Sequence, residues 1–110
     1  MKAYNQAKDQ IVIEEINEKG RTASFFSYGK LAVKLFTRPS SDGNPVHDTI
    51  EYDPSVLFFS KTTAKYGKRF VESKCARQDM WSLIKKHNQI QDVSGDLNTL
   101  GFDLLSRKLG

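Results

Sequence analysis

Residues 60–74 constrain the fold most, because their spacing predicts one amphipathic helix with a charged face and an aromatic face. The residues expected on the charged face are Lys61, Lys65, Lys68 and Glu72. Those expected on the aromatic face are Thr63, Tyr66 and Phe70. We therefore expect a helix that packs on the rest of the chain with its aromatic side and presents lysines on the other.

The start and the middle of this helix carry further signals. Ser60 and Thr62 each have a short side-chain oxygen that can accept a hydrogen bond from a free N–H group at the helix start. Gly67 in the interior costs about 1 kcal/mol relative to alanine. We expect at Gly67 either a close packing contact or a break in the helix.

The positive charge of the chain is concentrated in this helix and the segment after it. Residues 61–86 contain eight basic and two acidic residues, whereas residues 1–60 contain seven and eight, and residues 87–110 two and three. The net charge of +4 therefore comes from one quarter of the chain. Such a patch favours an anionic partner, although exposed helices also carry lysines for solubility alone.

The first half of the chain has the alternation and the turn residues of β-strands. We expect strands over residues 22–28 and 31–36, joined by a tight reversal at Gly29. In the second of these strands, Leu31, Val33 and Leu35 should face the core.

Three further segments of this half have less uniform patterns. Residues 48–52 are expected to form a short third strand. Residues 56–59 fit a fourth strand or a buried turn, and residues 10–16 fit a strand or a helix.

Two more helices are expected after residue 75. Asp79 can cap a helix over residues 80–87, whose apolar stripe is Met80, Leu83, Ile84 and His87. Asp96 can cap a third helix, with a stripe of Leu97, Leu100 and Leu104. Strands followed by helices predict an α+β fold, in which a small antiparallel sheet of three or four strands from the N-terminal half packs on two or three C-terminal helices.

Length and composition predict one domain over residues 1–110. No apolar run approaches a membrane span, no signal-peptide core is present, and Cys75 is the single cysteine, so we expect a cytoplasmic protein without membrane contact. Residues 1–9 are expected to be loosely ordered. Residues 37–47, rich in turn formers, are expected to form a mobile loop.

Two short segments resemble a pattern in small phage- and plasmid-encoded proteins of unknown function. Their Ser-Tyr-x-Thr-x-Ala strand is similar to Ser27-Tyr28-Gly29-Lys30-Leu31-Ala32-Val33, with Lys30 in place of Thr. Their Tyr-Ser-x-Thr-Thr-Ser-Lys helix start is similar to Phe59-Ser60-Lys61-Thr62-Thr63-Ala64-Lys65-Tyr66, with Ala64 in place of Ser. The resemblance, over residues 27–70, implies a mobile-element origin and a compact strand–strand–helix unit, and it implies no chemistry.

No arrangement of reactive side chains stands out as an enzyme site. His47, Cys75 and His87 lack the spacing of a zinc site, and no phosphate-binding glycine loop is present. A carboxylate-rich segment followed by a lysine would suit a metal-dependent nuclease, and here it consists of His47, Asp48, Glu51, Asp53 and Lys61. We expect a non-enzymatic protein without metal or cofactor and keep the nuclease as an alternative.

The basic surface is the best candidate binding site. Its residues are Lys61, Lys65, Lys68, Arg69, Arg77, Lys85 and Lys86. Because lysines outnumber arginines, contact with phosphates is expected more than reading of bases, so binding should be weakly sequence-specific. We expect a phage or mobile-element accessory protein that binds DNA, RNA or a host protein–nucleic-acid complex through this surface.

An alternative function is a small inhibitor of the anti-defence (anti-CRISPR-like) kind, which binds a host protein. The loop over residues 37–47 and the acidic strand over residues 48–53 would then form the contact. Edge strands and an apolar helix stripe could also join two copies of the chain in a homodimer.

Aromatic residues offer a further surface if they project from an exposed sheet, where they could stack on bases. They are Phe25, Phe26, Tyr28, Phe36, Tyr52, Phe58 and Phe59. A chain of this length needs most of them in its core, so packing is the expected role, with Tyr28 and Tyr52 the most exposed.

Overall fold

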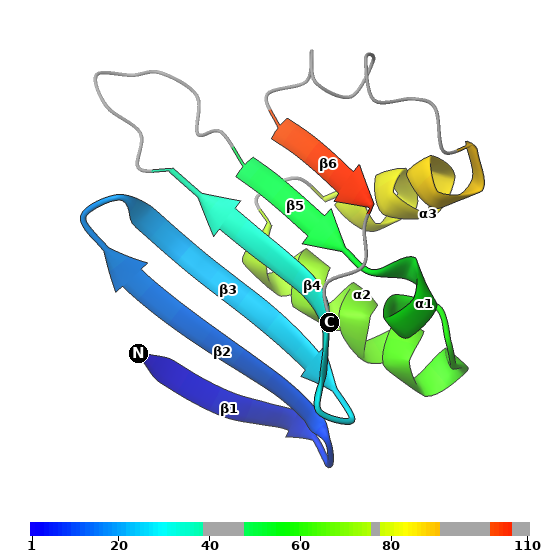
Figure 1. Cartoon of the computed structure of the whole chain (residues 1–110), viewed down its shortest axis with the longest axis horizontal. Helices are drawn as coiled ribbons and strands as arrows, with labels where there is room; N and C mark the ends of the chain where they lie inside the picture. The colour runs from blue at the N-terminus through cyan, green and yellow to red at the C-terminus, as the bar shows by residue number, and fades with distance from the viewer. Residues whose placement is uncertain (39–47, 76–77, 91–101, 107–110) are drawn as a thin grey trace.

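A six-stranded sheet runs through the molecule with its strands in sequence order (Figure 1). The strands are β1 (Lys2–Ala7), β2 (Gln10–Asn17), β3 (Gly20–Ser27), β4 (Lys30–Thr37), β5 (Asp48–Tyr52) and β6 (Phe102–Ser106). The first five pair antiparallel, and β6 pairs parallel with β5. The computed structural model describes residues 1–38, 48–75, 78–90 and 102–106, with the backbone alone for Asp48, Ile90 and residues 102–106.

Three helices follow β5 and cover one face of the sheet (Figure 1). They are α1 (Pro54–Leu57), α2 (Lys61–Lys74) and α3 (Met80–Ile90). α2 contacts β2, β3 and β4, whereas α1 contacts β4 and α3 contacts β6. The α+β class and the order of sheet before helices are confirmed. The predicted three or four strands were too few, because five antiparallel strands precede the helices.

The N-terminal segment contains a strand, whereas no secondary structure was predicted for residues 1–9. It forms β1, whose Tyr4 packs against the core and whose Gln6 side chain donates a hydrogen bond to the Tyr66 carbonyl of α2. The open choice for residues 10–16 resolves as a strand, in which Gln10 and Val12 are buried and Ile11 and Ile13 alternate to the other face.

The turn of the β3–β4 hairpin forms as predicted, but one residue of β4 faces the other side of the sheet. Tyr28 and Gly29 both have positive φ, at 51° and 79°, as a tight two-residue reversal requires. Val33 and Leu35 are buried as expected. A register shift between Phe25 and Phe26 pairs Leu31 with Phe26, so Leu31 lies half-buried on the opposite face.

One further open choice is decided by the structure, and one further segment differs from the prediction. Residues 56–59 form no strand, because Asp53 caps the short helix α1 by accepting a hydrogen bond from the Ser55 N–H group. Residues 102–106, expected at the end of a third helix, form β6. Residues 91–101 and most of the predicted loop, residues 39–47, lie outside the described residues.

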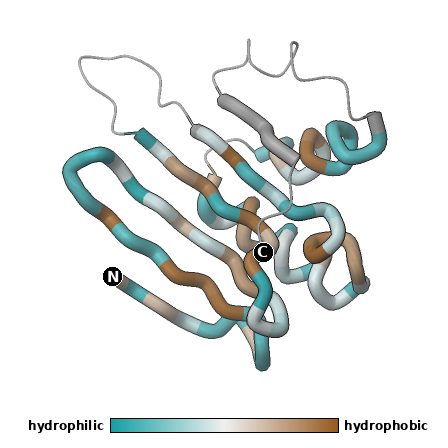
Figure 2. The backbone as a smooth tube through the Cα atoms, in the orientation of Figure 1, coloured by the Kyte–Doolittle hydropathy of each residue, from teal (hydrophilic) through white to brown (hydrophobic). Residues whose placement is uncertain are grey.

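The centre of the core is the contact between α2 and β3. Phe70 of α2 and Phe25 of β3 are buried, and their ring centroids are 5.8 Å apart. Gly67 marks a close contact and no break, because a Cβ atom at this position would overlap Cδ1 of Leu57. Figure 2 shows the apolar first half of β2 beside this region. The aromatic face of the helix is thus confirmed, with Thr63 and Phe70 buried and Tyr66 half-buried.

A buried polar pair joins β5 to α3. The Tyr52 hydroxyl and Nδ1 of His87 are 2.6 Å apart, and both side chains are buried. Tyr52 is therefore a core residue, contrary to the exposure expected for it. Met80, Ile84 and His87 form the predicted buried stripe of α3, and Leu83 lies half-buried beside it.

Burial of His87 makes the stability of the protein dependent on pH. Burial lowers the pKa of this imidazole below its ordinary value of 6.5, so the unfolded chain takes up the proton before the folded protein does. The contribution of His87 to stability is complete above pH 6.5 and is lost as pH falls through the lower pKa of the folded state. We expect the free energy of unfolding, measured with urea, to decrease over this range.

Two variants check that His87 is the cause. His87→Gln should remove most of this decrease, whereas His47→Gln should keep it. A decrease of the same size in His87→Gln would contradict the assignment.

Candidate functional site

A chain of hydroxyl groups fixes the start of α2 to the sheet. Ser60 is the N-cap, as predicted, and its Oγ accepts a hydrogen bond from the Thr63 N–H group at 3.1 Å. The Thr63 hydroxyl lies 2.8 Å from the Ser27 hydroxyl at the end of β3, and both residues are buried. The two segments of the resemblance, which are far apart in sequence, therefore meet at this point.

The predicted basic residues of α2 and α3 lie on the outer side of the helical layer. Both helices turn their buried residues to the sheet, which leaves the opposite sides exposed. The exposed basic residues on these sides are Lys61, Lys65, Lys68, Arg69, Lys85 and Lys86. We call this set the basic helical face. Arg77, the seventh predicted residue, lies outside the described residues.

Contacts within the basic helical face leave its cations accessible. Lys65 Nζ and Arg69 Cζ lie 5.5 Å and 5.2 Å from the centroid of the Tyr66 ring, close enough for cation–π attraction. Lys68 lies 3.8 Å from Glu72, but the two side chains are 57% and 49% exposed. A pair so exposed contributes at most about 1 kcal/mol, so Lys68 can exchange Glu72 for another anion.

Lys74, at the end of α2, belongs to the fold and not to this face. Its ammonium lies 2.8 Å from the Glu14 carboxylate, with the side chains only 16% and 12% exposed. The hydrogen bond from Lys74 lowers the pKa of Glu14 below its ordinary value, although burial opposes this effect. The Lys74 carbonyl also accepts a hydrogen bond of 2.7 Å from Arg21 of β3. The C-terminal end of α2 is therefore fixed to two strands.

The residues of the nuclease alternative are not gathered in one site. Asp53 is buried at the start of α1, whereas Glu51 lies on the uncovered side of the sheet, beside a pocket of about 260 Å³. His47 and the Asp48 side chain lie outside the described residues. Over the described parts of the chain, no three His, Cys, Asp or Glu residues lie close enough together to hold a metal ion.

The side of the sheet that faces away from the helices carries apolar side chains among polar ones such as Lys34 and Glu51. It is covered by no element in the described part of the chain (Figure 1). Its half-buried apolar residues are Ile11, Ile13, Phe26, Leu31 and Phe36. We call this set the open sheet face. The alternation in β2 and β3 indicated such residues, but the sequence could not show that the helices cover one side alone.

Two aromatic residues are exposed at the end of the sheet where α2 begins. Tyr28, in the β3–β4 turn, is 59% exposed, as expected for this residue. Phe59 is 85% exposed, whereas packing in the core was its expected role. The signal that was available is its position before the N-cap Ser60, where an apolar residue usually packs on the fourth helical residue, which here is the small Ala64.

Replacing Lys74 should cost stability, whereas replacing a lysine of the basic helical face should not. Lys74→Met leaves the Glu14 carboxylate poorly exposed and without its cation, a change expected to lower the free energy of unfolding by about 1–3 kcal/mol. Lys65→Met is the matched control and should change it by less than about 0.5 kcal/mol. Urea denaturation at pH 7 measures both values, and equal effects would contradict the separate roles of these lysines.

Comparison with known proteins gives no family for this chain. No family model, no curated protein and no solved structure matches it. The described helices include none with the length and apolar character that a membrane crossing requires.

Proposed function

We propose that this protein is a non-enzymatic, cytoplasmic accessory protein of a phage or other mobile element. Its basic helical face binds the phosphate backbone of DNA or RNA, either free or within a host protein–nucleic-acid complex. The binding is weakly sequence-specific, because five of the six residues are lysines, which act as point charges, and one is an arginine.

The observation that supports this proposal most is the exposure of all six basic side chains at positions opposite the buried residues of their helices. They come from two neighbouring helices, and all are exposed on the side away from the sheet. Glu72 is the acidic residue among the exposed positions of α2, and it is already close to Lys68. A rigid helical layer with an excess of positive charge suits a polyanion more than it suits a single small anion.

Binding of this kind should depend strongly on salt. Six phosphate contacts give a slope of log affinity against log salt of about −5 for a duplex and about −4 for a single strand. Nothing in the proposal requires a preferred base sequence.

Reversing three charges of the basic helical face should weaken binding and reduce the salt slope. In the variant Lys61→Glu, Lys65→Glu, Lys85→Glu, each lost phosphate contact lowers the slope by about 1. We expect the affinity for labelled DNA or RNA, measured by fluorescence anisotropy between about 50 mM and 200 mM salt, to fall at least tenfold at the lower concentration.

The matched control is a variant with the same change in net charge at exposed positions elsewhere: Lys2→Glu, Lys19→Glu, Arg38→Glu. It should retain most of the affinity. An equal loss of affinity in both variants would mean that the net charge of the protein, and not the basic helical face, determines binding. Absence of binding by the unaltered protein at low salt would also reject the proposal.

A second candidate function is an inhibitor that binds a host protein, and the open sheet face supports it. Partly exposed apolar side chains that gather on one surface are typical of protein-contact surfaces. This surface lies opposite the basic helical face, so the two candidates use different sides of the molecule.

Photo-crosslinking distinguishes the two candidates. A photoreactive residue at Lys34, on the open sheet side, is expected to capture a protein if the inhibitor function is correct. The same residue at Lys65 is expected to capture nucleic acid if the first proposal is correct. Products at Lys65 that contain protein and no nucleic acid would contradict binding to free nucleic acid.

A further inference from the structure

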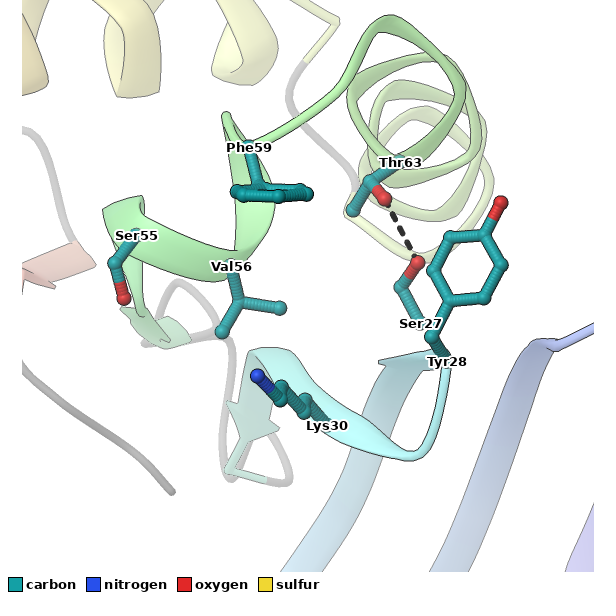
Figure 3. A pocket seen from close by; sticks show the side chains of 7 residues that line it. All are labelled: Ser27, Tyr28, Lys30, Ser55, Val56, Phe59 and Thr63. Atoms are coloured by element: carbon teal, nitrogen blue, oxygen red, sulfur yellow. Dashed lines mark hydrogen bonds between the residues drawn. The ribbon is translucent and has the colours of Figure 1, made fainter.

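A small pocket lies where the β3–β4 turn approaches the start of α2 (Figure 3). Its volume is about 240 Å³. The residues that line it are Ser27, Tyr28, Lys30, Ser55, Val56, Phe59 and Thr63. We call it the turn pocket.

The turn pocket combines apolar walls, hydroxyl groups and one cation. Figure 3 shows the Phe59 ring on one side of it, with Val56 and Lys30 opposite and the Ser27–Thr63 hydroxyl pair at its flank. Lys30 is the charged residue among those that line it, and it is exposed. This chemistry suits a flat ring with polar edges that is attached to an anionic group.

The exposure of Phe59 and Tyr28 points to a ligand. Tyr28 is 59% and Phe59 85% exposed, and exposed apolar side chains that gather at one pocket are a feature of ligand and partner sites. An aromatic ring can stack on any nucleic-acid base, because every base has a π-face.

The turn pocket lies at the start of α2, where the basic helical face also begins. Phe59 and the N-cap Ser60 immediately precede Lys61, the first basic residue of α2. From Lys61 to Arg69 the helix extends about 12 Å at 1.5 Å per residue. Because Thr63 lines the pocket from the side of α2 that faces the sheet, a strand bound to the outer cations must pass around the start of the helix to place a nucleotide in the pocket. The β1–β2 turn, which adjoins Tyr28, adds no net charge beside the pocket, because Lys8 and Asp9 are both exposed there and have opposite charges.

We propose that the turn pocket receives one unpaired base of a single-stranded DNA or RNA, which stacks on Phe59 while Lys30 contacts its phosphate. This inference rests on the proposed function and narrows it to single strands. A duplex keeps its bases stacked on one another, so it can use the basic helical face but not the turn pocket.

The test is fluorescence anisotropy with labelled single-stranded DNA and RNA and with duplexes of the same length and sequence. The unaltered protein should bind at least one of the single strands more tightly than its duplex. Phe59→Ala should weaken single-strand binding about five- to one-hundredfold and leave duplex binding unchanged. Because Phe59 is exposed, the variant should fold, and circular dichroism checks this.

Two further variants separate stacking from general apolar contact. Phe59→Leu keeps much of the bulk without the ring and should lose affinity as Phe59→Ala does. Ile16→Ala removes an apolar side chain that is 77% exposed at a distant site and should change neither affinity.

The outcomes distinguish failure of this inference from failure of the proposed function. Equal, salt-dependent affinity for single strands and duplexes, with no effect of Phe59→Ala, would overturn the base pocket and leave the basic helical face as the binding site. Full single-strand affinity in Phe59→Leu would also overturn it, since binding would then need no aromatic ring at this position. No binding to any oligonucleotide at low salt would overturn both proposals.

Discussion

The stacking of Phe70 on Phe25 is the interaction on which the rest of the structure depends. It brings the middle of α2 onto the middle of the sheet, with the ring centroids 5.8 Å apart. Gly67, one turn earlier, lets Leu57 approach the helix closely, so that α1 shares the same core. Because this contact fixes which side of α2 is buried, it also fixes which side presents the lysines.

Both ends of α2 are held as firmly as its middle. At the start, Thr63 is joined to Ser27 of β3, and at the end, Lys74 is joined to Glu14 of β2. These contacts join positions distant in the sequence, so the four α2 residues of the basic helical face lie on an element that cannot rotate without breaking them. A charged surface on such a rigid element keeps its cations in a constant arrangement, which suits repeated contacts along a phosphate backbone.

Local patterns predicted what depends on neighbouring residues. The spacing of Lys61, Lys65 and Lys68 identified the outer side of α2, and Gly29 identified the turn of the β3–β4 hairpin. The same patterns did not predict structure that depends on a partner distant in the sequence. Residues 102–106 have leucines that suit a helix, but they form a strand because β5 offers an edge to pair with. Lys74 could not be separated from the other lysines, because its partner Glu14 lies sixty residues earlier.

The turn pocket could not be predicted from the sequence for a similar reason. Tyr28 and Phe59 are separated by the whole of β4 and β5, and only the packing of α1 on β4 brings them to one pocket. A single bulge between Phe25 and Phe26 likewise moved Leu31 from the predicted core to the open sheet face. The sequence thus predicted the basic half of the candidate interface, and the aromatic half depended on tertiary structure.

The helical side of the molecule, and not the open sheet face, is expected to bind nucleic acid. Mapping the contact surface by NMR tests this expectation residue by residue. The protein, labelled with ¹⁵N, would be titrated with a single-stranded oligonucleotide at low salt, and the amide shifts would be followed residue by residue. We expect shifts concentrated at Tyr28, at Phe59 and along α2 from Lys61 to Arg69, with Ile13 and Phe36 unaffected. Shifts confined to the open sheet face would contradict it.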